Sequence, residues 1–242
     1  MDREELIKRY AAGERDFREV DLSGVDLSGA VWDKWENPIG APDLSGINLS
    51  RAKLRKSRLV GINFSDAKFI CADLIDAKLS CANLSRADLS TTNLINADLI
   101  RANLSCANLR DSDLDGACLR EANFAGADLE NSNLRCCELH DANFARANLR
   151  DAGLDSTMLV RTNFSYANLT DADLYSSYIE DANWRGVNLT NAKLDCVVFE
   201  RVDLTEANLT GAWDADVDNC ILCNTIMPDG SAIALSCRLG GT

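Results

Sequence analysis

Between residues 42 and 211, a large apolar residue recurs at every fifth position. All 34 such positions, from Leu44 to Leu209, hold Leu, Phe, Ile or Trp. Two positions before each of them, 20 of the 34 residues are Ala, and the residue in between is Asp or Asn 23 times. A period of five matches neither the 3.6 of a helix nor the 2 of a continuous strand. The spacing therefore predicts a short extended segment followed by a turn.

Side chains alternate between the two sides of an extended segment, which places Ala and Leu inward and Asp or Asn outward. A fixed repeat of this kind indicates a solenoid, in which each unit buries its apolar side against its neighbours. The largest core residues are separated by multiples of 20 and predict four units per coil: Phe64, Phe124, Phe144, Phe164 and Trp184.

These repeats resemble the pentapeptide-repeat family. The segment Arg9 to Phe17 and the turn sequence Met227 to Gly230 also resemble cyanobacterial members. The resemblance implies an all-β fold, a right-handed quadrilateral β-helix. About ten coils spaced ~4.8 Å apart would form a rod on the order of 50 Å long.

We expect a single elongated domain over residues 1–242. Asp2, followed by Glu5, has the spacing of a capping box and predicts a short N-terminal helix that covers the open edge of the first coil. The expected parts are a helical cap (1–14), a first coil (15–32), a loop excursion (33–41), regular repeats (42–211) and an irregular last coil with a C-terminal cap (212–242).

The formal net charge of −13 disfavours direct binding to nucleic acid and favours basic partners or simple solubility. The ten cysteines are scattered and do not form a disulfide framework, which is typical of a reducing compartment. No signal peptide or membrane-spanning run is recognisable. We expect a cytoplasmic protein that does not enter a membrane.

Nothing in the sequence predicts a catalytic site. The only histidine, His140, falls on a turn, and the carboxylates lie on convex, solvated faces where pKa values stay ordinary. Cys220 and Cys223 lack the second ligand pair of a structural zinc site. We expect no enzyme, no catalytic residue, no metal and no cofactor.

The four faces differ at their outward positions. Asp or Asn occupies nine of nine positions on the first face, eight of nine on the second and five of eight on the third. These side chains can bond the turning backbone. The fourth face has one of eight: Arg58, Lys78, Asp98, Cys118, Glu138, Met158, Tyr178 and Val198.

Apolar residues on the fourth face suggest a docking strip. Met158, Val160, Tyr178 and Val198 are expected to lie side by side, ~4.8 Å apart from coil to coil. Exposed apolar patches mark protein contacts. The alternatives are self-association as a homodimer and a face that merely tolerates substitution. Trp35, in the loop excursion, is a second candidate contact, or it folds back on the rod.

An acidic edge is expected at the corner between the second and third faces. It comprises Asp111, Asp113, Asp115, Asp151, Asp155, Asp171, Asp173 and Asp195. Such an edge is either solvated or faces a basic surface.

Two functions remain open. The first is a non-enzymatic interaction rod, regulatory or scaffolding, that binds a protein along the fourth face. The second is a DNA mimic that inhibits DNA gyrase or another DNA-binding protein, as the resemblance implies for some members. DNA of ~50 Å would carry about 30 negative charges, whereas this chain carries 13 net.

Overall fold

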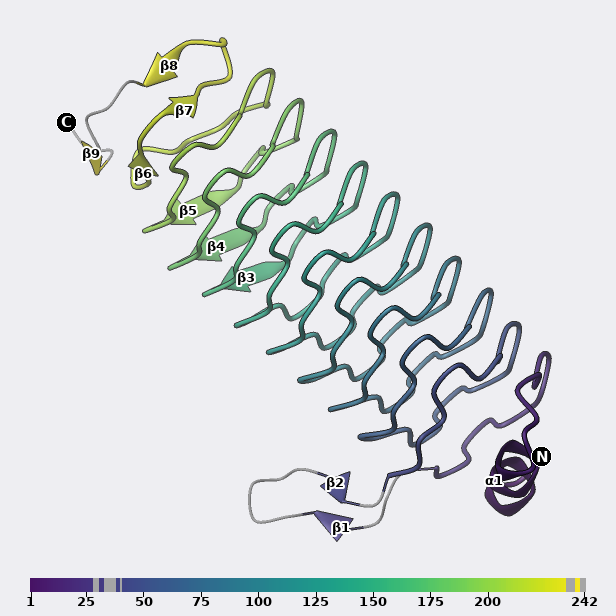
Figure 1. Cartoon of the computed structure of the whole chain (residues 1–242). Helices are drawn as coiled ribbons and strands as arrows, with labels where there is room; N and C mark the ends of the chain where they lie inside the picture. The colour runs from purple at the N-terminus through teal and green to yellow at the C-terminus, as the bar shows by residue number, and fades with distance from the viewer. Residues whose placement is uncertain (28–30, 33–37, 40, 234–237, 240–242) are drawn as a thin grey trace.

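The computed structural model describes residues 1–27, 31–32, 38–39, 41–233 and 238–239. Stacked coils form a rod, with the N-terminal helix at one end and the C-terminal strands at the other (Figure 1). Outward residues pair in parallel with the residue 20 positions further on, as Asn63 does with Asn83 and Asn83 with Asn103. The predicted four units per coil are confirmed by this spacing.

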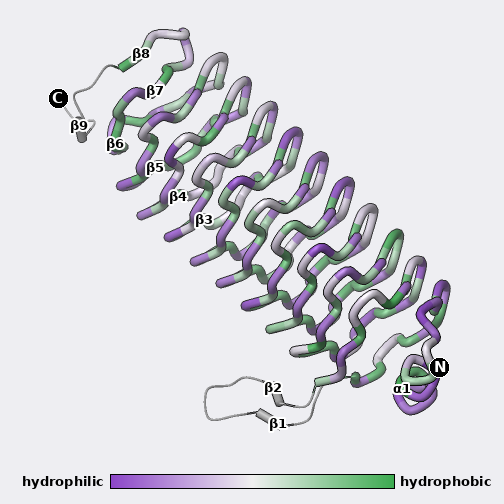
Figure 2. The backbone as a smooth tube through the Cα atoms, in the orientation of Figure 1, coloured by the Kyte–Doolittle hydropathy of each residue, from purple (hydrophilic) through white to green (hydrophobic). Residues whose placement is uncertain are grey.

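The inside of the rod holds the residues that the repeat assigns to it. The Leu and Phe positions from Leu44 to Leu209 are buried, and the Ala positions between them are buried as well. Phe144 stacks on Phe124 at 4.6 Å between ring centroids and on Phe164 at 4.7 Å. Hydrophobic and hydrophilic residues alternate along every coil (Figure 2). The core is therefore a continuous column that only stacking completes.

Each corner turns through one residue in the left-handed backbone region. All 34 positions at five-residue spacing from Gly46 to Gly211 have a positive φ, for example 57° at Arg101. This conformation favours Gly, Asn and Asp, yet many corners hold Arg, Ser, Thr or Cys. The surrounding hydrogen bonds therefore determine the turn.

The N-terminal end is helical. Helix α1 spans Arg3–Ala11, and Asp2 accepts a hydrogen bond from the Glu5 backbone N–H at 2.9 Å. Leu6 is fully buried in the core of the rod, and Tyr10 donates its hydroxyl hydrogen to the Ser45 carbonyl at 2.8 Å. Charged residues flank this apolar contact at both helix ends, consistent with the helix dipole.

A hairpin leaves the first coil. Strands β1 (Val31–Trp32) and β2 (Pro38–Ile39) pair antiparallel and protrude from the N-terminal end of the rod (Figure 1). As a result Asp26 pairs with Arg58, 32 residues further on instead of 20. The excursion was expected to begin at residue 33, after a core unit at Trp32. In the structure Trp32 lies in β1 and pairs with Pro38.

The C-terminal end departs from the regular repeat. Strands β6 (Ile221–Leu222) and β9 (Arg238–Leu239) pair antiparallel, as do β7 (Thr225–Ile226) and β8 (Ala232–Ile233). Met227 and Gly230 form the predicted turn, with the Gly230 N–H donating to the Met227 carbonyl at 2.9 Å. Within the described residues, no helix has the length and apolarity needed to cross a membrane.

Candidate functional site

The first face is built from a ladder of Asn side chains. The Asn143 Nδ2 donates to Asn123 Oδ1 at 3.0 Å, and the Asn163 Nδ2 donates to Asn143 Oδ1 at 3.0 Å. The same Asn143 Oδ1 accepts the Ala145 backbone N–H at 3.1 Å. Each Asn thus joins neighbouring coils and also closes its own turn. This arrangement confirms the architectural role expected for Asp and Asn on this face.

In the last three coils of the fourth face, three-residue strands replace the Asn ladder. Strands β3 (Met158–Val160), β4 (Tyr178–Glu180) and β5 (Val198–Glu200) form a parallel sheet, with Met158 beside Tyr178 and Tyr178 beside Val198 (Figure 1). In these three coils no Asx oxygen takes the N–H two residues on, and the pairing continues for three residues. Arg58, Lys78, Cys118 and Glu138 also lack an Asx side chain but pair through single bridges, so the longer pairing belongs to these three coils and not to every coil without Asx.

The expected apolar strip lies on these three strands, and two of its residues are exposed. Met158 is 47% exposed and Val198 is 46% exposed, whereas Tyr178 between them is partly buried. The expected neighbourhood of these three residues is confirmed by their strand register. Large apolar side chains placed side by side in water are a typical feature of contact surfaces.

Val160 does not belong to the exposed strip. Its side chain is only 8% exposed, so its predicted place among the contact residues is wrong. It occupies the position after the inward Leu159, at the end of strand β3. Its partner in the sheet is Glu180.

Carboxylates surround the C-terminal end of the strip. Arg201 forms ion pairs with Glu180, with Asp181 at 2.6 Å and with Glu200 at 3.4 Å. One guanidinium therefore serves three carboxylates. The pKa of Tyr178 is raised, first by desolvation and then by the negative charges of Glu180 and Glu200. This end of the fourth face is apolar in its middle and negative at its edge.

An open concavity of ≈ 690 Å³ adjoins the strip. Its lining includes Ile100, Arg120, Glu138, His140 and Met158. The Nδ1 atom of His140 is buried and has no hydrogen-bond partner among the described residues. The concavity adjoins the apolar strip, and its lining contains both basic and acidic side chains.

The acidic edge is broader than predicted and partly neutralised. Only Asp111, Asp151 and Asp171 occupy the corner between the second and third faces. The others lie on the third face or the corner after it. Within this region Arg135 pairs with Asp155 at 2.8 Å, and Lys193 pairs with Asp173 at 3.0 Å.

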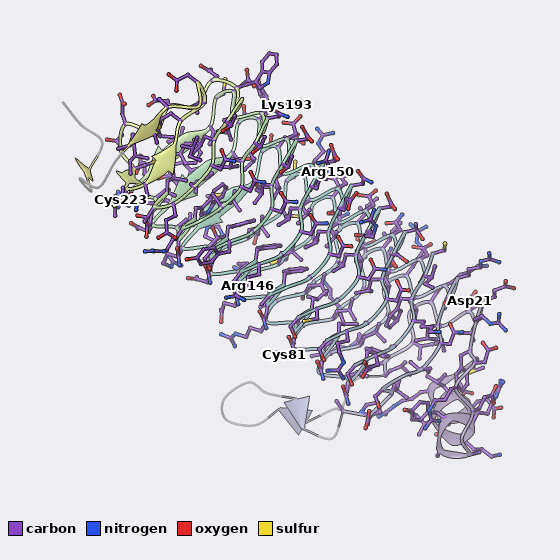
Figure 3. All side chains as sticks on the ribbon, turned by 45° about the horizontal axis from the view of Figure 1, so that its top comes forward. Asp21, Cys81, Arg146, Arg150, Lys193 and Cys223 are labelled. Atoms are coloured by element: carbon purple, nitrogen blue, oxygen red, sulfur yellow. The ribbon has the colours of Figure 1, made fainter. Side chains whose placement is uncertain are left out.

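Basic side chains also enter the corner itself. Arg150 contacts Asp171 at 2.7 Å and Asp151 at 3.1 Å. Figure 3 shows Arg150 and Lys193 on the outside of the rod. Four of the eight Asp residues of the acidic edge are therefore ion-paired, namely Asp151, Asp155, Asp171 and Asp173.

Two further predictions concern single residues. Trp35 lies outside the described residues. The nine cysteines of the described part carry free thiols, and Cys137 is buried at an inward position, as expected. Among the described residues, no three His, Cys, Asp or Glu side chains gather closely enough to hold a metal ion.

Charge is distributed unevenly along the rod, a feature that the per-face count missed. Residues 42–80 contain seven basic and four acidic residues, whereas residues 81–211 contain eleven basic and twenty acidic residues. The exposed Arg58 and Lys78 pair in register on the fourth face. Counting net charge in windows along the chain would have revealed this polarity.

Comparison with known proteins relates this architecture to a family of repeat proteins. The family description "Pentapeptide repeats" matches residues 43–81, 82–121 and 115–151. The description "Pentapeptide repeat region" matches residues 137–209. Among curated proteins, none matches the chain. The matched residues are the regular repeats, so the family likeness depends on the core and corners.

Solved structures agree with these family descriptions. HetL, a pentapeptide-repeat protein involved in heterocyst differentiation regulation in the cyanobacterium Nostoc sp. strain PCC 7120, is 31% identical. The match covers 96% of this chain and 100% of HetL, with a TM-score of 0.53. Rfr23 from the cyanobacterium Cyanothece 51142 is 28% identical over 56% of this chain and 95% of its own, with a TM-score of 0.24.

A trypsin-treated variant of QnrB1, a plasmid-mediated fluoroquinolone resistance protein, is 20% identical over 72% of this chain and 86% of its own, with a TM-score of 0.53. At this identity the likeness shows the fold alone. The neighbours imply a right-handed quadrilateral β-helix, and the 20-residue pairing agrees with its four-sided coils. With the family descriptions matched across the regular repeats, the chain belongs to the pentapeptide-repeat family.

Proposed function

We propose that this chain is a non-enzymatic interaction protein of the cytoplasm that binds a protein partner along its fourth face. The observation that carries this proposal is the exposed strip of Met158, Tyr178 and Val198, held in register by three parallel strands. On the first face, the equivalent positions hold Asp or Asn that stabilise the rod. The fourth face lacks that architecture and presents apolar surface instead.

The comparison with HetL supports a regulatory role for such a rod. HetL is involved in the regulation of heterocyst differentiation, and a filled solenoid can act in regulation only through what it binds. The apolar strip has the composition of an interface centre, and the carboxylates of Glu180 and Glu200 would form its polar rim.

A capture experiment tests the proposal. Met158→Asp with Tyr178→Asp places two charges in the strip, and we expect it to lose the partners captured by the wild-type chain. A matched control, Ala125→Asp with Ala145→Asp, adds the same charge on two consecutive coils at a corner outside the fourth face. We expect the control to retain those partners. If the strip variant retains them too, the fourth face is not the binding surface.

DNA mimicry finds less support. The Asp residues of the acidic edge alternate with Arg135, Arg150 and Lys193, whereas a mimic needs closely spaced and unpaired negative charge. We expect excess chain to leave the supercoiling activity of DNA gyrase unchanged. Inhibition at stoichiometric amounts would favour the mimic over the interaction rod.

A further inference from the structure

The outward column of the fourth face changes its chemistry from one end to the other. Eight residues stack in consecutive coils through parallel pairing. In order they are Arg58, Lys78, Asp98, Cys118, Glu138, Met158, Tyr178 and Val198. The column begins with two adjacent cations and ends with an apolar strip bordered by carboxylates.

The basic end is neutralised only in part. Between residues 81 and 211, ten of the eleven Arg and Lys residues form an ion pair. At the basic end Arg58 pairs with Asp26 at 3.2 Å, whereas Lys78, which lies in register with Arg58, forms no ion pair with any residue that the structure describes. Like charges directly opposite each other destabilise a ladder. Lys78 therefore leaves positive charge at this end of the column.

The other end has the opposite excess. Glu180, Asp181 and Glu200 share the single guanidinium of Arg201, and Tyr178 lies beside these carboxylates. A cation that approaches here meets negative charge beside a partly buried tyrosine, and the negative charge attracts it.

Because its two ends differ in charge, the column is complementary to the same column of a second copy that runs in the opposite direction. When two copies pack face to face with the rods antiparallel, a two-fold axis between Cys118 and Glu138 brings Lys78 of one copy to Tyr178 and Glu180 of the other. The same operation brings Arg58 to Val198 and Glu200. Such a self-complementary patch is what a two-fold dimer interface requires.

The middle of the column is mixed under this operation, because Asp98 of one copy faces Met158 of the other. Ile100 lies beside Asp98, whose Oδ1 accepts the Ile100 N–H at 3.2 Å. Ile100 of one copy therefore lies near Met158 of the other but not directly opposite it. These two residues already border the same open concavity within one chain, so the two concavities would face each other across the axis.

We propose that the fourth face is a self-association surface on which a second copy of this chain docks antiparallel. This inference depends on the proposed function, because it names the occupant of the same face. The column from Arg58 to Val198 spans seven coil steps, or ~34 Å, and is about 10 Å wide. That footprint is roughly 350 Å² on each copy, below the ~800 Å² per partner of stable complexes. The dimer is therefore weak and reversible.

Charge reversal provides a sharp test. Variant A carries Arg58→Glu and Lys78→Glu, and variant B carries Glu180→Lys and Glu200→Lys. In a homodimer of A, carboxylates oppose carboxylates, and in a homodimer of B, lysines oppose lysines. In a mixed dimer, every acidic end meets a basic end. We expect each variant alone to be monomeric and the mixture of both to dimerise.

The measurement is sedimentation velocity over a protein concentration series up to about 1 mM. We expect the wild-type chain to dimerise at least tenfold more weakly at 0.5 M salt than at low salt, because salt screens the charges at both ends. Lys53→Glu with Lys68→Glu, on the third and second faces, matches variant A in charge, and we expect it to dimerise like wild type. Thermal unfolding confirms that each variant is folded.

The outcomes separate this inference from the proposed function. A wild-type chain that stays monomeric to about 1 mM, or a mixture of A and B that stays monomeric, overturns the antiparallel dimer. If the strip variant Met158→Asp with Tyr178→Asp still loses a foreign partner in that case, the proposed function stands without it. If dimerisation is lost equally in the Lys53 and Lys68 control, the effect comes from net charge and the inference fails.

Discussion

The ring of Tyr166 lies over the backbone of Gly186, the corner residue one coil further on. A Cβ added at Gly186 would approach the Tyr166 ring carbons Cδ1 and Cε1 to 2.5 Å. The Tyr166 hydroxyl donates to Glu206 Oε2 at 3.4 Å, two coils away. The absence of a side chain at Gly186 thus allows one tyrosine to span three coils.

We expect Gly186→Ala to lower the free energy of unfolding by about 2–3 kcal/mol. Its φ of +65° disfavours a side chain, and the new methyl group must also displace the Tyr166 ring. Gly46→Ala is the matched control, since its φ is +66° and nothing lies within 4 Å of the added Cβ. We expect that control to lose only about 1 kcal/mol in chemical denaturation. Equal losses of unfolding free energy in both variants would show that the Tyr166 ring moves aside without destabilising the fold.

The Asn ladder of the first face should carry measurable stability. Asn143→Ala removes two hydrogen bonds between coils and the one that closes its own turn. We expect a loss of about 1–3 kcal/mol in the free energy of unfolding. The exposed outward residue of the fourth face, Lys78, provides the comparison, and Lys78→Ala should stay within about 0.5 kcal/mol. Similar values for the two variants would remove the architectural role assigned to the ladder.

Trp184 carries an unsatisfied polar atom in the core. Its Nε1 is buried with no partner among the described residues, while its ring packs 4.9 Å from Phe164. In Trp184→Phe, the relieved desolvation offsets the lost volume, so we expect a change within about 1 kcal/mol. Phe144→Ala, in the same column, should lose about 3–5 kcal/mol. A loss of that size in Trp184→Phe would indicate that packing alone governs the site.

Cys136 and Cys137 are adjacent in sequence but should differ in reactivity. Cys136 is exposed at a corner, whereas Cys137 is buried and donates to the Leu114 carbonyl at 3.1 Å. We expect a maleimide to label Cys136 in the folded chain and Cys137 only after unfolding, as mass spectrometry of peptides would show. Equal labelling of both thiols in the folded chain would contradict the inward placement of Cys137.

Burial also raises the pKa of the Cys137 thiol. An unfolded thiol ionises near pH ~8.5, while the folded one stays neutral. The contribution of Cys137 to stability is therefore fully present below that pH and is lost as the pH rises above it. Cys137→Ala should reduce the decline in stability between about pH 8 and pH 10, and an unchanged decline would contradict this assignment.

Much of the architecture follows from linear spacing. The five-residue period assigns Leu44 to the inside and Asp43 to the outside, and the 20-residue spacing of Phe124, Phe144 and Phe164 indicates how many units complete a coil. The same counting found the fourth face, because a missing Asx residue is visible in the sequence. These features depend only on which residue types occupy fixed positions of the repeat, and a single sequence contains that information.

The burial of single side chains and the ion pairs between coils could not be predicted from the five-residue pattern. The sequence alone determined the repeat, the inward and outward positions and the neighbourhood of Met158, Tyr178 and Val198. Only the tertiary structure decided that Val160 is buried and that Arg150 and Lys193 pair with carboxylates of the acidic edge. The physical reason is that burial and ion pairing depend on distances between stacked coils, which the five-residue pattern does not contain.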